Sequence, residues 1–496
     1  MNPTEKTPLM IERGKELRLR QLISLLVVVL TFEGIARKAF PTLSVWLFLL
    51  KDFIVTIMAL YVVRMPAAPA LSALWRAYKI LAVLFVPPFL CTAWNDWVVG
   101  DHLLLAVFGA KQYLLFPMVG FATFYAFHRV KMEEILRFFR WASLLIIPTA
   151  ALAFVQLRLP HDHWLNMAVT GTSLSAFAAA GELRVSSSFS FVAQYCAFLN
   201  AQVFMLMLAL HEWRKRSLIW KALLFSLVPL FVMSSFITGS RGAVVGNTVI
   251  ILVAGVLVLC RFEFGKALKI VAVAVLLLLT VRVVQHFVPQ TMAAYSEREE
   301  GHLIGLSAEV KQRVYDSFFV PVKDKSMRTF FGNGLGVMSN GSDTFSPYAA
   351  VWRNYMWTET DFSSTLFEGG IYLAVIWYGF RLYVIGLTTR RFLREISGEF
   401  SVPTAFTQGF VIVIGVTGTL AIQPPIAIWW WLAVGMVLVL SWKCISPPEP
   451  EIEIEPDLPP PRKLFRGRSL YAEVLHSPRE KPGVEGAPRD KSGRDQ

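Results

Sequence analysis

Long apolar runs separated by short polar connections occupy the chain from about residue 21 to residue 445. Each run is about 20 residues long, the length an α-helix needs to cross the hydrocarbon core of a bilayer. The pattern predicts an all-α polytopic membrane protein with about twelve transmembrane helices. The expected spans are residues 21–40, 42–63, 79–99, 103–127, 136–157, 190–210, 219–238, 243–261, 267–288, 363–386, 403–422 and 426–444.

The polar segments outside these runs predict the domain organisation. Residues 1–20 precede a membrane domain at 21–445, in which a long polar loop at 289–362 joins the ninth and tenth spans. We expect this loop to fold as a small cap of helices. Residues 446–496 are rich in Pro and charge with few apolar positions, a composition that predicts a disordered tail.

Lys and Arg gather in alternate connections, and this distribution predicts the orientation, because basic loops stay on the cytoplasmic side. They precede the first span and follow the second, fourth, sixth, eighth and tenth, whereas intervening connections such as residues 423–425 carry little charge. Both termini are therefore expected to be cytoplasmic, with the loops at 158–189 and 289–362 facing outward. The basic loops also explain the net charge of +13, so nucleic acid is not an expected partner.

The amino-acid composition limits the class of protein and the kinds of site that the chain can contain. Hydrophobic residues make up 55% of the chain, which excludes an ordinary soluble domain. The four cysteines are dispersed, without C-x-x-C spacing, so we read them as small apolar residues and expect neither a disulfide framework nor a metal site. No cofactor is expected.

Charged residues nevertheless occur within the apolar runs, where each costs roughly 2.5–3.5 kcal/mol on insertion scales, and such residues are candidates for a functional site. Glu33 and Arg37, spaced i, i+4, can pair with each other, whereas the neighbours Lys51 and Asp52 cannot and each needs its own partner. In the expected orientation every member of the set lies at mid-depth or in the outer half of the membrane. It comprises two acidic residues and seven basic ones, Glu33, Asp52, Arg37, Lys38, Lys51, Lys111, Arg184, Arg241 and Arg282. This excess predicts a basic cavity that attracts lipid phosphates, although each residue singly has a structural explanation.

The stretch Gly239-Ser240-Arg241-Gly242 joins the seventh and eighth spans. The two glycines allow a tight turn, and Ser240 is a suitable N-cap for the next helix. A helix amino terminus carries free amides and a positive dipole end, and the Arg241 guanidinium can bind phosphate oxygens in a bidentate way. We interpret the turn as an anion site; the alternative is an arginine that extends to the membrane interface.

The segment SRGA between two spans, followed by a large loop, resembles the bacterial O-antigen ligase and polymerase superfamily. Further similarities cover most of residues 20–440: EGIARKAFP at 33–41, LKD at 50–52, LRVSSSFSF at 183–191, QRVYDSFFVPVK at 312–323 and FFGNGLG at 330–336. The resemblance implies an integral-membrane glycosyltransferase with a GT-C-like fold that uses undecaprenyl-diphosphate-linked glycans at the periplasmic face of the bacterial inner membrane.

One departure from the family bears on function. The ligases carry a histidine at the end of the large loop, ahead of a glycine pair, whereas this chain has TETDFSSTLFEGGIY at 358–372, with Thr358 or Glu359 at the equivalent place. This difference favours a polymerase of oligosaccharide repeat units, making O-antigen or exopolysaccharide, over a lipid A ligase.

The sequence has no metal-ligand spacing, so we predict a metal-independent reaction in which arginines stabilise the diphosphate leaving group. We expect Arg241 and Arg313 in that role, Glu359 as the base, and Lys111, Arg184, Arg282, Asp361 and Ser240 as contacts to substrate. The alternative for Glu359 and Asp361 is a solvated loop position. Expected partners are the donor and acceptor lipid-linked glycans, membrane lipids and a chain-length regulator.

Three other functions stay open at this point. One is an O-antigen ligase or protein O-glycosyltransferase of the same fold, against which the missing histidine argues weakly. The second is a flippase or transporter of lipid-linked glycans, which predicts repeat symmetry that we do not find in the sequence. The third is a non-catalytic structural membrane protein, which leaves the basic cavity unexplained.

Overall fold

The computed structural model describes residues 3–94, 102–169, 183–211, 213–261, 263–266, 268, 270, 330–339, 341–344, 346–355 and 360–445. The chain divides into two units, 1–447 and 448–496, and the second lies outside these residues. In the described part the regular structure is helical, with no β-strand. The predicted disorder of the tail and the predicted span at 267–288 therefore stay predictions.

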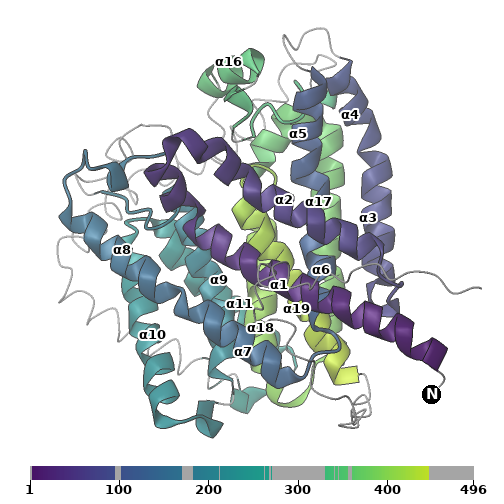
Figure 1. Ribbon diagram of the computed structural model, residues 1–496, viewed down its shortest axis with the longest axis vertical. Coiled ribbons are helices and arrows are strands. Elements are labelled where there is room, and N and C mark those ends of the chain that lie inside the picture. The colour runs from purple at the N-terminus through teal and green to yellow at the C-terminus, as the bar shows by residue number, and fades with distance from the viewer. Residues whose placement is uncertain are drawn as a thin grey trace, which may run out of the picture. The chain divides into compact units, whose positions relative to one another are not determined.

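The first unit is a bundle of long helices (Figure 1). The helices are α1 (Pro3–Ala39), α2 (Ser44–Val63), α3 (Ser72–Leu84), α4 (Val86–Ala93), α5 (His102–Leu114), α6 (Pro117–Phe127), α7 (Met132–Leu144), α8 (Ile146–Arg158), α9 (Val192–Leu210), α10 (Leu218–Ile237), α11 (Arg241–Leu259), α16 (Pro347–Tyr355), α17 (Asp361–Glu395), α18 (Ser401–Thr417) and α19 (Pro424–Ile445).

Ten helical stretches of the described chain are long and apolar enough to cross a membrane, and α5 with α6 forms a further, broken stretch bent by 42°. Eleven of the predicted spans coincide with these stretches, so the prediction of an all-α polytopic membrane protein is confirmed. The boundaries differ in places. The first stretch begins at Glu12 instead of residue 21, and the predicted span at 136–157 is the pair α7 and α8, which meet at Leu145.

The core of the bundle lies around α19, with Trp429, Trp430 and Trp431 all inaccessible to solvent. Close approach of α19 to α6 depends on small residues, since a Cβ added to Gly435 would lie 2.5 Å from the Gly120 carbonyl oxygen. In a bilayer, lipid tails are as apolar as the side chains, so helices associate through such close packing. Substitution of Gly435 would therefore separate these two helices.

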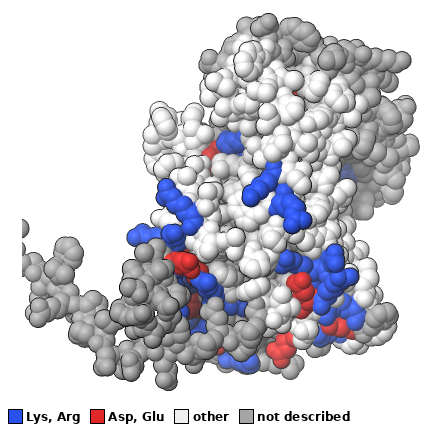
Figure 2. All heavy atoms as spheres, turned by 90° about the vertical axis from the view of Figure 1, so that its right-hand side faces the viewer, with Lys and Arg blue, Asp and Glu red and all other residues white. Residues whose placement is uncertain are grey.

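The two ends of the bundle differ in charge. We call the end that carries α16 the α16 end and the opposite one the basic end. Segments far apart in the sequence meet at the basic end through contacts such as Arg129 with Glu12 and Lys266 with the Gly398 carbonyl. On the face drawn in Figure 2, the upper part of the described surface carries little charge, and Lys and Arg gather in the lower part.

Helix α17 is broken near the α16 end. Gly369 and Gly370 leave helical geometry, and Gly370 adopts φ 64° and ψ −165°, a region open almost only to glycine. A side chain at Gly370 would also overlap the Phe330 carbonyl oxygen. The kink therefore requires glycine for two independent reasons, conformation and space.

We predict that Gly370→Ala destabilises the protein by more than 1 kcal/mol, about the cost of forcing a Cβ into left-handed backbone. Thermal unfolding in detergent measures the effect as a lowered Tm. Gly379→Ala in the same helix is the matched control, because a Cβ there has no neighbour within 4 Å. Equal Tm values for the two variants would contradict the described kink.

Candidate functional site

Two buried ion pairs lie between α1, α2 and α5. The Lys51 ammonium contacts Glu33 at 3.0 Å, and the Lys111 ammonium contacts Asp52 at 2.6 Å. Lys51 is wholly inaccessible to solvent. Lys51 and Asp52 thus take partners from different helices, as their adjacent positions predict. Lys111, expected to contact substrate, is instead held by a carboxylate.

The ring of Phe48 gathers three cations of this region, and we call the group the Phe48 cluster. Lys51 lies 3.8 Å, Arg37 4.9 Å and Lys111 5.7 Å from the ring centroid. Arg37 also pairs with Glu33 at 3.2 Å, which confirms the i, i+4 pair. Three cations against the two carboxylates of the ion pairs give the Phe48 cluster a formal charge of +1.

Residues 183–191 are fastened to α1 beside the Phe48 cluster. The Ser188 carbonyl accepts the Ile35 N–H at 2.7 Å, while its hydroxyl donates to the carbonyl of Thr31, which in an ideal helix is the partner of Ile35. Lys38 donates to the Ser186 hydroxyl at 2.9 Å and Arg37 to that of Ser190 at 3.3 Å. The carboxy-terminal turn of α1 is therefore connected to the segment that carries Arg184.

The connection between α10 and α11 is a tight turn. Gly239 adopts φ 62°, and Ser240 caps α11 by accepting the Gly242 N–H at 3.3 Å, so the predicted N-cap is confirmed. Arg241 is the first residue of α11 and is partly exposed. The prediction that Gly242 is needed for the tight turn is wrong. Gly242 lies in the first turn of α11, and a Cβ added there would meet only the Ser240 hydroxyl, at 3.5 Å.

Arg184 and the α10–α11 turn lie near a common neighbour. The Cys196 side chain in α9 is close to the side chains of Thr238 and Ser240 and interacts electrostatically with Arg184. Two predicted substrate contacts, Arg184 and Ser240, thus belong to one region with Arg241, the predicted stabiliser of the leaving group, and we call it the α11 cap region. It combines a helix amino terminus with two guanidinium groups, an arrangement suited to binding an anion.

The glycine-rich segment at 330–336, within the large loop, packs into the kink of α17. Asn333 donates its N–H to the Phe367 carbonyl at 2.8 Å, and Gly334 donates to that of Glu368 at 3.0 Å. Breaking the helix at Gly369 frees carbonyls that the segment then satisfies. The kink and the segment therefore form a single structural unit.

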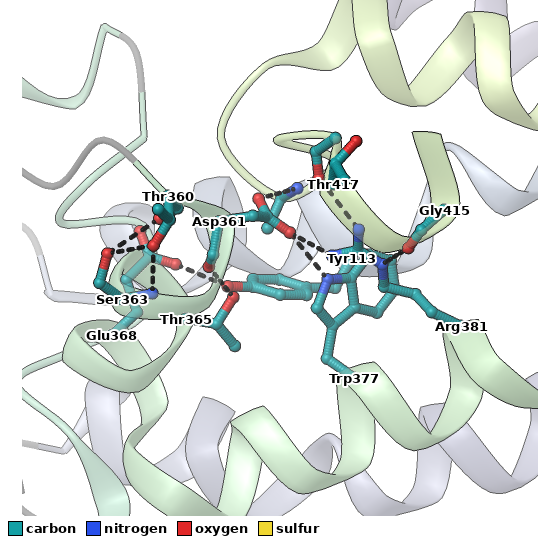
Figure 3. Close-up of polar contacts among 12 residues, drawn as sticks. Tyr113, Thr360, Asp361, Ser363, Thr365, Glu368, Trp377, Arg381, Gly415 and Thr417 are labelled. Atoms are coloured by element: carbon teal, nitrogen blue, oxygen red, sulfur yellow. Dashed lines mark hydrogen bonds and ion pairs between the residues drawn. The ribbon is translucent and has the colours of Figure 1, made fainter. Parts of the chain in front are cut away.

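The buried Glu368 carboxylate stabilises this unit through a hydrogen bond to each of its two oxygens. One oxygen accepts the Met338 N–H at 2.9 Å, and the other accepts the Tyr113 hydroxyl at 2.9 Å. Glu368 is 2% exposed, and Figure 3 shows its side chain and the Tyr113 hydroxyl facing each other. These contacts hold the end of the large loop against α5, in which Lys111 lies two residues before Tyr113.

Asp361 begins α17 and is 3% exposed. Its carboxylate contacts the Arg381 guanidinium at 2.6 Å and accepts the Ala421 N–H at 2.8 Å, and Arg381 also donates to the carbonyls of Gly415 and Gly418 (Figure 3). This network ties α17 to the α18–α19 connection. The geometry favours a structural role for Asp361 over the expected contact with substrate, and its burial replaces the alternative of a solvated loop position.

Arg282, Arg313 and Glu359 lie outside the described residues. Glu368 and Arg381 were not among the predicted site residues, although both fall within the predicted span at 363–386. The cost of charge in an apolar run singles out both residues by the same argument that selected Lys51 and Lys111. Tyr113 carries no comparable signal, because a tyrosine is unremarkable in a membrane helix.

Comparison with protein-family models and with curated proteins finds no match for this sequence. The resemblance to the O-antigen ligase and polymerase superfamily therefore stays a prediction that rests on the short motifs.

We predict that Gly239→Ala disturbs the α11 cap region, whereas Gly242→Ala leaves it intact. At Gly239, alanine would have to adopt φ 62°, which costs about 1–2 kcal/mol. At Gly242, which lies in α11, alanine stabilises the helix because its helix propensity is higher than that of glycine. Thermal unfolding in detergent separates the two variants: the Tm falls for Gly239→Ala and is unchanged or higher for Gly242→Ala. The reverse order would show that the turn is formed differently.

Proposed function

We propose that the chain is a membrane glycosyltransferase that polymerises undecaprenyl-diphosphate-linked oligosaccharide repeat units into O-antigen or exopolysaccharide. The observation that carries the proposal is the α11 cap region, where Arg184, Ser240 and Arg241 gather at a helix amino terminus. A diphosphate carries more than one negative charge, so a helix dipole and two guanidinium groups suit it. The ion pairs of the Phe48 cluster hold α1, α2 and α5 together, and α1 in turn contacts the segment that carries Arg184.

In the proposed reaction an acceptor sugar hydroxyl attacks the anomeric carbon of the donor glycan. The bond from that carbon to the diphosphate oxygen breaks, and its electron pair leaves with undecaprenyl diphosphate. Arg241, together with Arg313, would stabilise the charge that develops on this leaving group. Glu359 is our candidate for the base that takes the hydroxyl proton. Arg184 and Arg282 would contact the donor.

The proposed orientation puts the α16 end in the periplasm of a bacterial inner membrane and both termini in the cytoplasm. The charge difference between the two ends supports it, because Lys and Arg are retained on the cytoplasmic side. Lys15, Arg64 and Arg129 belong to the basic end, where Lys15 donates to the Arg64 carbonyl and Arg129 contacts Glu12. In this orientation the α11 cap region faces the leaflet that holds the lipid-linked substrates.

We predict that Arg241→Ala abolishes long polymer in a deletion strain that wild-type protein restores. Loss of one donor to a developing oxyanion typically lowers turnover about 10²–10³-fold. The measurement is the chain-length distribution of extracellular polysaccharide on gels, at equal amounts of protein in the membrane. Arg64→Ala is the matched control, because Arg64 is an exposed arginine at the basic end.

A strain with Arg241→Ala that makes polymer of normal length would remove Arg241 from the proposed reaction. Loss of polymer with Arg64→Ala as well would indicate a general effect of removing arginines. Arg241→Lys adds a graded test, since lysine keeps the charge and lacks the bidentate geometry. We expect shortened polymer from this variant.

A further inference from the structure

A pocket of about 320 Å³ opens between α7 and α10 at the basic end of the bundle. We call it the α7–α10 pocket. Both helices begin beside it, α7 after the connection at 128–131 and α10 after η5 (Trp213–Lys215). It is lined by Glu133, Arg137, Arg140, Trp141, Arg216 and Trp220. None of these residues belongs to the proposed catalytic site.

The lining is basic. Three arginines face one glutamate, so the formal charge of the α7–α10 pocket is +2. Arg140 is 6% exposed and lies in α7 among buried apolar residues, which is a costly position for a guanidinium group. Arg137 is exposed and Arg216 partly exposed. The pocket is thus lined by three guanidinium groups, which bind phosphate oxygens through charge-assisted hydrogen bonds.

The rim of the pocket is aromatic and apolar. Trp141 and Trp220 meet edge to face, with ring centroids 5.9 Å apart, and Trp141 is 60% exposed. Leu218 and Ile219, adjacent to Trp220, are each 80% exposed. Tryptophan is enriched at the level of lipid headgroups, and apolar side chains of this exposure in a membrane protein contact lipid chains. The pocket therefore opens towards lipid rather than towards another helix of the described bundle.

We propose that the α7–α10 pocket binds the phosphate headgroup of an anionic phospholipid from the leaflet at the basic end. The arginines contact the phosphodiester, Trp141 and Trp220 lie at the headgroup level, and the acyl chains extend along the exposed apolar side chains of α10. Basic pockets between membrane helices are suited to such headgroups, and the leaflet that attracts basic segments is the one that holds anionic lipid. Free phosphate has the same charged group as the headgroup, but it has no acyl chains to contact the apolar rim.

The test is native mass spectrometry of the full chain in detergent with added phosphatidylglycerol or phosphatidylcholine. We expect wild-type protein to retain phosphatidylglycerol preferentially. Arg137→Gln with Arg216→Gln should lower the preference by about tenfold or more, since each basic group near an anionic surface contributes about 1 kcal/mol. The control removes two exposed arginines of α1 at the same end, Arg13→Gln with Arg18→Gln, and should leave the preference unchanged.

Three results would overturn the proposal: equal retention of the two lipids by wild-type protein, an unchanged preference in the pocket variant, or displacement of the lipid by inorganic phosphate at millimolar concentration. The last would assign the pocket to a soluble phosphate compound. Tm values of all variants report folding. Should the double variant unfold, Arg137→Gln alone, at an exposed position, tests the same contact with a smaller expected loss of about threefold to fivefold.

Discussion

A charge inside a membrane-spanning bundle has no water to solvate it, so its counter-charge must come from the protein. Three ion pairs follow from this constraint: Lys51 with Glu33, Lys111 with Asp52, and Arg381 with Asp361. Removing one partner of such a pair typically costs about 3–5 kcal/mol, because the other charge stays buried. The positions of the helices that carry these residues are therefore coupled.

The coupled helices position the polar segments that make up the proposed site. The pairs hold α1, α2 and α5 together, and Arg381 holds α17 to the α18–α19 connection through Asp361 and two carbonyls. The kink of α17 then receives the segment at 332–338, which Glu368 and Tyr113 secure. Residues 183–191, fastened to α1, bring Arg184 towards the cap of α11. In the proposed function these contacts preorganise a diphosphate site, which spares the cost of ordering it during reaction.

Much of the fold follows from local pattern. Hydropathy predicts the membrane helices, and the i, i+4 spacing of Glu33 and Arg37 and the cap at Ser240 involve only neighbours in sequence. The pairs of Lys51 and Lys111 do not follow in the same way, because their partners are 18 and 59 residues away.

The kink of α17 is also non-local. Its glycines are visible in the sequence, but the amides that satisfy its carbonyls come from Asn333 and Gly334, more than 30 residues earlier. Asp361 depends on a distant residue in the same way: its position beside a polar loop suggested contact with substrate, and its observed partner is Arg381, 20 residues later. Glu368 could have been predicted as a site residue from the sequence, because it is a charged residue in an apolar run.

The proposed glycosyl transfer is tested most directly by reconstitution of the purified chain in liposomes with an undecaprenyl-diphosphate-linked repeat unit. Products are separated by length, and released undecaprenyl diphosphate is quantified. The account predicts chains of several repeat units, with one undecaprenyl diphosphate released for each linkage formed. Movement of the intact lipid-linked unit across the bilayer without any new glycosidic linkage would contradict it and identify a transporter.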